Sequence, residues 1–185
     1  MANEVLVDVN TRMEKTIEVL VREMSSMRTS RATPSLVEHV KVDYHGIPTP
    51  LNQLSSITAP EVNLIRIQPW ERSMIGTIEK AILKANLGLS PTNDGAVVRV
   101  TLPPLTDDRR RDLVKMVHKR LEEARVALRN QRRDGVERLK AMEKEKMLPK
   151  DEASRLAEHV QKLTDAFIDK VSKVGVDKEA EISQG

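Results

Sequence analysis

Four arginines in the second half of the chain could bind an anion, because their spacing gathers them on one side of a helix. At about 100° per residue, an arc of roughly 100° holds Arg125, Arg129, Arg132 and Arg133. A guanidinium group offers a fork of N–H donors that matches phosphate oxygens. Because these residues extend over about two turns, they fit an extended polyanion better than a single phosphate. We call these four residues the arginine strip.

A solvated helix face held by ion pairs is the alternative interpretation of the strip. Glu122 falls on the same arc, whereas Asp134 and Glu137 project elsewhere. Unpaired like charges three or four residues apart in a helix repel each other by about a few tenths of a kcal/mol. The scarcity of acidic partners on this arc therefore favours an external anion.

A second basic pair, Arg28 and Arg31, stands at the end of the first helical pattern, residues 4–31. Basic side chains at a helix C-terminus can interact with the helix dipole. The same two residues can equally contact an anion, and both interpretations stay open because helix packing decides where they lie.

Nothing else in the chain has the spacing of a reactive centre. The four histidines show no metal-ligand spacing, no cysteine is present, and the glycine-rich nucleotide motifs and the serine elbow are absent. We therefore expect a protein that is not an enzyme and has no cofactor or metal.

The N-terminus lacks the pattern of a secretory signal and no apolar run reaches the roughly 20 residues of a membrane span. These features predict a soluble, cytoplasmic protein, and the net charge of +3 is too small to indicate nucleic-acid binding by itself.

Three long segments carry the apolar period of helices that pack against one another. They are residues 4–31, residues 107–146 and a stretch that begins near Asp151. In the first and third segments, apolar residues recur at alternating spacings of four and three, as in a bundle seam. Pro34 ends the first pattern and Pro149 precedes the third. One amphipathic helix cannot bury its own stripe, so the three segments predict a three-helix bundle.

The middle of the chain has the sequence patterns of short strands in place of long amphipathic helices. Strand-like patterns occupy residues 37–44, 53–58, 62–68 and 96–102, and residues 71–86 read as a helix that Gly88 caps. The predicted fold class is α+β with two domains. An elongated three-helix bundle (residues 1–31 plus 105–185) carries an inserted small β/α/β domain (residues 32–104), and the two connectors at one end of the bundle form a hinge.

Eight stretches in order resemble the ribosome recycling factor family over nearly the whole chain. They are Arg28-Thr29-Ser30-Arg31-Ala32-Thr33-Pro34-Ser35-Leu36, Val42-Asp43-Tyr44-His45-Gly46, Thr49-Pro50-Leu51, Gln68-Pro69-Trp70, Gly88-Leu89-Ser90-Pro91-Thr92-Asn93-Asp94-Gly95, Leu102-Pro103-Pro104-Leu105-Thr106, Arg129-Asn130-Gln131-Arg132-Arg133-Asp134 and Gln161-Lys162-Leu163-Thr164-Asp165. Each motif alone is weak, but their order and the family's length make the resemblance specific.

The resemblance implies a monomer, shaped like transfer RNA, that binds the post-termination ribosome at the subunit interface and splits it with elongation factor G and GTP. The bundle would contact large-subunit ribosomal RNA. The matching arginines would be Arg129, Arg132 and Arg133, with Arg125 beside them, and Arg28 and Arg31 would form the bundle's other basic cluster. The small domain would swing about Ala32, Thr33, Pro34 and Ser35 and about Pro103, Pro104 and Leu105.

The chain departs from the family's pattern at five positions: Ser30, His45, Glu71, Gln131 and Gly135. Ser30 bears on the hinge geometry. Gly135 lies on the core-facing side of its helix, where it permits either a close helix approach or a local bend.

Without the resemblance, a helical bundle that scaffolds another protein through its insert remains the alternative function. Binding to ribosomes at two salt concentrations separates the two hypotheses, because only phosphate contacts weaken strongly with salt.

Overall fold

The computed structural model describes residues 1–29 and 31–184, which form two compact units. The helical unit contains Met1–Met27 and Asp107–Gln184, and the small unit contains Arg28–Thr106. The predicted effect of Ser30 on the hinge lies outside the described residues.

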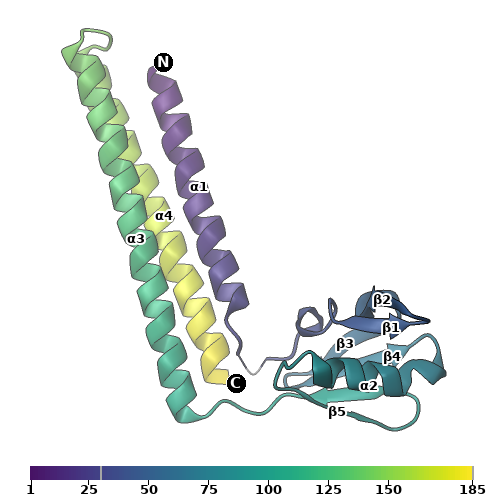
Figure 1. The fold of residues 1–185 in the computed structure, drawn as a ribbon. Helices are drawn as coiled ribbons and strands as arrows, with labels where there is room; N and C mark the ends of the chain where they lie inside the picture. Colours follow the sequence, from purple (N-terminus) through teal and green to yellow (C-terminus); the bar gives the residue numbers. More distant parts are fainter. Residues whose placement is uncertain (30, 185) are drawn as a thin grey trace. The chain divides into compact units, whose positions relative to one another are not determined.

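Three helices form the helical unit and run side by side: α1 (Ala2–Ser26), α3 (Asp107–Lys144) and α4 (Lys150–Gln184) (Figure 1). The N-terminus and the α3–α4 turn lie at the same end of this bundle. One apolar side of each helix is buried, and these sides include Met13, Leu20, Met24, Leu121, Leu128, Leu139, Leu156, Val160, Phe167 and Val171. The predicted three-helix bundle is therefore confirmed, and its core consists of the apolar stripes that the sequence pattern indicates.

Helix α1 ends at Ser26, earlier than the predicted end at residue 31, because Met27 adopts an extended conformation (φ −71°, ψ 120°). The last turn of α1 contains no basic residue. Instead Lys178 of α4, only 7% exposed, donates from Nζ to the Met27 carbonyl oxygen at 3.4 Å. This buried ammonium supplies the positive charge that a helix C-terminus favours. The interpretation of Arg28 and Arg31 as dipole partners on α1 is therefore wrong, because both residues follow the end of the helix.

The small unit is built on a four-stranded antiparallel sheet in the order β3-β4-β6-β5. Its strands are β3 (Ser55–Glu61), β4 (Leu64–Pro69), β5 (Ser90–Asn93) and β6 (Val98–Thr101). A separate hairpin pairs β1 (Lys41–Tyr44) with β2 (Ile47–Pro50), and the sheet's helix is α2 (Ile75–Lys84). Short 3₁₀ helices cover Pro34–Leu36, Leu51–Gln53 and Arg72–Met74.

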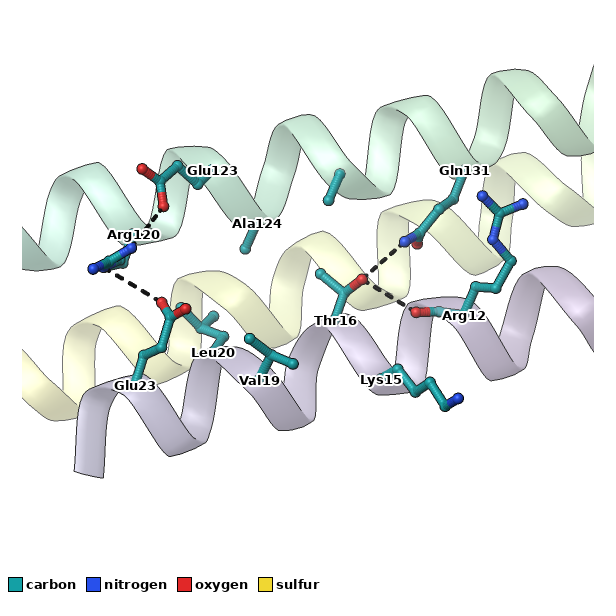
Figure 2. A pocket seen from close by; sticks show the side chains of 11 residues that line it. Arg12, Lys15, Thr16, Val19, Leu20, Glu23, Arg120, Glu123, Ala124 and Gln131 are labelled. Atoms are coloured by element: carbon teal, nitrogen blue, oxygen red, sulfur yellow. Dashed lines mark hydrogen bonds and ion pairs between the residues drawn. The ribbon is translucent and has the colours of Figure 1, made fainter. Parts of the chain in front are cut away.

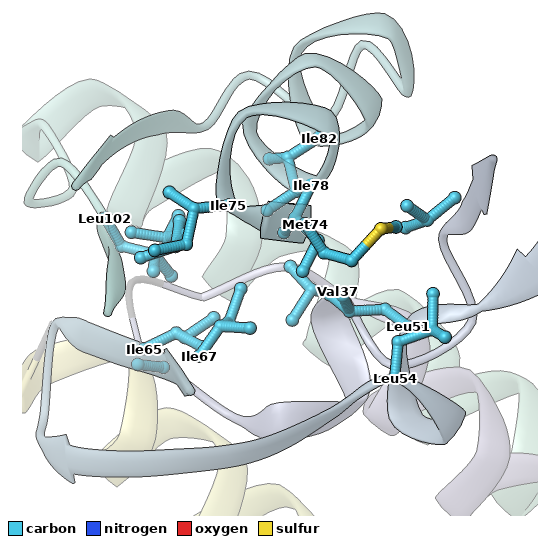
Figure 3. Close-up of a cluster of buried hydrophobic side chains, with 14 residues drawn as sticks. Val37, Leu51, Leu54, Ile65, Ile67, Met74, Ile75, Ile78, Ile82 and Leu102 are labelled. Carbon is cyan, nitrogen blue, oxygen red and sulfur yellow. The ribbon is translucent and has the colours of Figure 1, made fainter. Parts of the chain in front are cut away.

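One face of this sheet packs against α2. Ile65 and Ile67 of β4 are fully buried, and Ile78 and Ile82 of α2 complete the same core (Figure 3). Alternate residues of a strand point to opposite faces, so the side chains between the buried ones lie on the other face of the sheet.

Two strands of the small unit were not predicted. Strand β2 contains Pro48 and Pro50, and β5 contains Pro91. Each strand pairs with only one neighbour, which is where a strand tolerates proline. The predicted strand at residues 37–44 is also shorter in the structure, since Val37 follows a 3₁₀ helix and only Lys41–Tyr44 pair.

Candidate nucleic-acid interface

Helix α3 presents the arginine strip on the side that adjoins α4. Arg132 donates from Nη1 to Oε1 of Gln161, on α4, at 3.4 Å. The opposite flank of α3 faces α1, where Arg138 pairs with Asp8 and Asp134 pairs with Arg12, each at 2.6 Å. The strip is therefore separate from the α1–α3 contact, and Asp134 projects away from it as predicted.

Glu122 partly neutralises two members of the strip. Its Oε1 accepts from Arg129 Nη2 at 2.7 Å and its Oε2 lies 3.5 Å from Arg125 Nη1. The hydrogen bond from Arg129, followed by the positive charges of both arginines, lowers the pKa of Glu122 below its usual value. Glu122 therefore stays ionised at neutral pH, and the strip has more acidic support than its sequence suggested.

Arg132 and Arg133 are the members of the strip that are best placed for an external anion. Arg132 is partly buried, and its partner Gln161 is a neutral amide that also donates to Asp165 at 2.9 Å. Arg133 is exposed and has no hydrogen bond or ion pair among the residues that the structure describes. The strip can therefore offer two guanidinium groups without first breaking an ion pair.

We expect Glu122→Gln to strengthen binding to RNA, because it releases Arg125 and Arg129 from a competing carboxylate. The gain should be about two- to fivefold, the range that exposed ion pairs span. Fluorescence anisotropy with a labelled RNA hairpin measures it. The matched control is Glu123→Gln, which changes the charge equally and also releases an arginine, Arg120, but on the flank of α3 that faces α1. An equal gain in both variants would show that net charge, and not the strip, is responsible.

Arg28 and Arg31 belong to the small unit and not to the bundle surface. Arg28 donates from Nη1 to the carbonyl oxygen of Leu87, within the same unit. Arg31 is exposed and has no polar partner among the described residues. Their contacts therefore group these two arginines with the small unit, and the expectation that they form a basic cluster that binds RNA stays a prediction.

The predicted hinge residues differ in how firmly they are held. Ala32 is buried in the core of the small unit, and its N–H donates to the Val62 carbonyl oxygen at 2.6 Å. Thr33 precedes the 3₁₀ helix Pro34–Leu36, which contains Pro34 and Ser35. In contrast, Pro103, Pro104 and Leu105 lie outside regular secondary structure.

A groove of about 390 Å³ lies between α1 and α3 (Figure 2). Its walls include Val19, Leu20 and Ala124, with Arg120 held between Glu23 and Glu123 at its rim. The interhelical pair of Arg120 with Glu23 was not predicted, because its partners come from helices that are far apart in the sequence.

Gln131 lies at the other end of this groove. Its Nε2 donates to Thr16 Oγ1 at 2.9 Å, and Thr16 Oγ1 donates to the Arg12 carbonyl oxygen. The Gln131 Oε1 atom is buried and has no partner among the described residues. A flipped amide would place its oxygen next to Thr16 Oγ1, but the single hydroxyl proton of Thr16 is already donated to the Arg12 carbonyl oxygen. The flip would also leave the amide nitrogen at the position where no partner lies.

We expect Gln131→Ile to raise the free energy of unfolding by about 1 kcal/mol, because a buried amide oxygen without a partner is costly. Urea unfolding monitored by circular dichroism measures the change. Asn130→Ile, at the exposed neighbouring position, is the control and should not stabilise the protein. A lower stability of Gln131→Ile would mean that the amide is satisfied by water in the groove.

Residues 1–29 and 31–184 contain no group of three or more His, Asp or Glu side chains arranged to hold a metal ion. Within the same ranges, none of the helices is both long and apolar enough to span a bilayer.

Comparison with known proteins finds matches over the whole fold. The family model described as "Ribosome recycling factor" matches residues 20–182. A ribosome-recycling factor from Dehalococcoides mccartyi is 49% identical over 184 residues, covering 100% of both chains. One from Nitratidesulfovibrio vulgaris is 52% identical over 178 residues, covering 96% of each chain.

Two solved structures share the architecture. A solution structure of a ribosome recycling factor aligns with a TM-score of 0.76 at 43% identity, covering 100% of this chain and 98% of the other. A second match has a TM-score of 0.63 and 41% identity and covers 98% of both chains. It comes from models of the Thermus thermophilus factor and Escherichia coli elongation factor G bound to the E. coli post-termination complex.

Proposed function

The chain belongs to the ribosome recycling factor family, and from this premise we propose that it recycles ribosomes after termination. It binds the post-termination ribosome and, together with elongation factor G, separates the subunits and releases mRNA and tRNA. The observation that carries the proposal is the family match over residues 20–182, at about half identity to relatives along their full length. The protein is not an enzyme in this role, because elongation factor G hydrolyses the GTP.

The arginine strip is the part of the helical unit that we assign to large-subunit ribosomal RNA at the subunit interface. Arg132 and Arg133 supply guanidinium groups that form no ion pair with a carboxylate among the described residues. Arg129 can contact RNA once its ion pair with Glu122 breaks. Because phosphate contacts carry no base information, such a strip fixes position on the RNA. The protein acts as a monomer without a cofactor, in the cytoplasm where ribosomes work.

Motion of the small unit about the two connectors is the second element of the proposal. Ala32 to Ser35 are held by the core and by a 3₁₀ helix of the small unit, so we expect them to move with that unit. In the other connector Pro103 and Pro104 have fixed φ angles, which concentrates the rotation at Leu105 and Thr106.

Subunit splitting tests the proposed function directly. Post-termination ribosomes are mixed with elongation factor G and GTP, with and without this protein, and light scattering follows dissociation. We expect rapid splitting only in the complete mixture. Splitting at the same rate without the protein, or no splitting with it, would contradict the proposal.

A further inference from the structure

The sheet of the small unit has one covered face and one open face. Ile65 and Ile67 of β4 are buried on the side that α2 covers (Figure 3). Val98 and Val100 of β6 are buried in the same core. The residues between them point to the other side, where Arg66 is exposed. We call this second side the open sheet face.

Two arginines lie directly opposite each other at the centre of the open sheet face. The cross-strand register pairs Thr58 with Arg66, Arg66 with Arg99, and Arg99 with Thr92, one residue from each of the four strands. Directly opposed residues of an antiparallel pair have Cα atoms only about 4.5–5.5 Å apart. Like charges at this distance destabilise a sheet. The pairing of Arg66 with Arg99 in the row Thr58–Arg66–Arg99–Thr92 is therefore unfavourable for the stability of the sheet, which indicates a role in binding.

Only one of the two arginines has an acidic partner among the described residues. Arg99 Nη1 pairs with Asp94 Oδ2 at 2.6 Å, and this hydrogen bond, with the N–H groups of Val97 and Ala96, keeps the pKa of Asp94 well below its usual value. Arg66 has neither an ion pair nor a hydrogen bond within the described ranges. The open sheet face thus presents one compensated and one uncompensated guanidinium group.

The remaining side chains of the open sheet face are mostly polar, and Glu61 at the edge of the sheet is the acidic one among them. Following the same alternation, they are Ser56, Glu61, Leu64, Gln68, Ser90 and Thr101. Arginine, serine, threonine and glutamine are the side chains that contact phosphate oxygens. A protein partner would instead be expected to seat aromatic or apolar anchors in pockets. Leu64, which is half-buried, is the one large apolar residue that the register places on this face among those described.

We propose that the open sheet face binds the phosphate backbone of RNA through Arg66 and Arg99, with Thr58 and Thr92 at the ends of the row. This contact is additional to the arginine strip of the bundle and gives the small unit its own attachment to RNA. It rests on the proposed function for one point only, that the RNA is presented by the ribosome.

The first test is the salt dependence of ribosome binding by the full chain. Arg66→Gln removes no contact within the described structure, so the fold should be unaffected. Losing one phosphate contact should lower the slope of log affinity against log salt by about 0.7–0.9, and Arg66→Gln with Arg99→Gln should lower it by about twice as much. Lys80→Gln on α2 changes the charge equally on the covered side and should leave the slope almost unchanged. Equal slopes for Arg66→Gln and Lys80→Gln would overturn the proposal.

The second test identifies the partner by cross-linking. Because the chain has no cysteine, Thr92→Cys gives one attachment point for a photoactivatable label on the open sheet face, and Lys80→Cys gives the control. On post-termination ribosomes, we expect the label at residue 92 to react with RNA and the label at residue 80 to react much less. Cross-links from residue 92 to protein alone, or none, would overturn the RNA assignment. If wild-type protein and controls failed to bind ribosomes at all, the proposed function itself would fail.

Discussion

Replacing Arg129, Arg132 and Arg133 together with alanine should weaken binding to post-termination ribosomes by roughly a hundredfold or more at about 0.1 M salt. The estimate follows from counterion release, since each lost phosphate contact removes about 0.7–0.9 from the slope of log affinity against log salt. The three residues are exposed or partly buried on one side of α3 and contribute nothing to the bundle core. The fold should therefore survive the change. Co-sedimentation across a range of salt concentrations measures both the affinity and the slope.

The helical unit offers a control with the same change in charge. Arg12, Arg120 and Arg138 also lie on the bundle, but each forms an ion pair across the α1–α3 contact, with Asp134, Glu23 and Asp8 respectively. Alanine at these three positions should leave the salt slope close to that of the wild type. If both triple variants lost affinity equally, net charge would account for binding and the role assigned to the arginine strip would be wrong.

The strip shows what helical periodicity can and cannot predict. Placing the arginines beside the apolar stripe required only the regular rotation per residue, and Arg132 and Arg133 lie where this rotation puts them. The support from Glu122 was underestimated, because Arg129 is seven residues away and reaches back two turns. Rules for neighbours three and four residues apart do not include such a pair.

The end of α1 could not be located from the sequence for a related reason. The predicted helix continued to residue 31 because no helix breaker precedes Pro34. Lys178, which donates to the Met27 carbonyl oxygen at the end of α1, is separated from Met27 by 151 positions, so only the packed bundle brings them together. The same end point led to the interpretation of Arg28 and Arg31 as dipole partners in the last turn of this helix.

The small unit was harder to predict than the bundle because its elements are short. Its buried central strand β4 was recognised from alternation, whereas β2 and β5, with their prolines at sheet margins, resembled turns. The row of Arg66 and Arg99 requires the register between β4 and β6, which the sequence does not reveal. The apolar period of a helix shows from its own sequence which side packs against other helices. Which residues of two strands lie opposite each other depends on the register between the strands.

Gly135→Ala should destabilise the protein by about 1–3 kcal/mol, although alanine is the better helix former by about 0.5–1 kcal/mol. A Cβ atom at position 135 would lie 2.7 Å from Val9 Cγ2 on α1 and 3.7 Å from Val160 Cγ1 on α4. Val9 is fully buried, and its branched side chain has little rotamer freedom. The close-approach interpretation of Gly135 is confirmed by this geometry, and α3 continues through the glycine without interruption. Urea unfolding of the wild type and variant measures the cost.

A double-mutant cycle with Val9→Ala distinguishes steric conflict from a general effect of the new methyl group. Removing the two Val9 methyl groups makes the space that a Cβ atom at position 135 needs, so the double variant should be more stable than the sum of the single changes predicts, by about 0.5–3 kcal/mol. Gly175→Ala offers a second comparison, because its Cβ would lie 2.5 Å from Leu121 Cδ1, at the end of a side chain that can rotate away. It should therefore cost less than Gly135→Ala. Additive effects in the cycle would show that α1 and α3 separate freely at Gly135 and that their close approach is not fixed by packing.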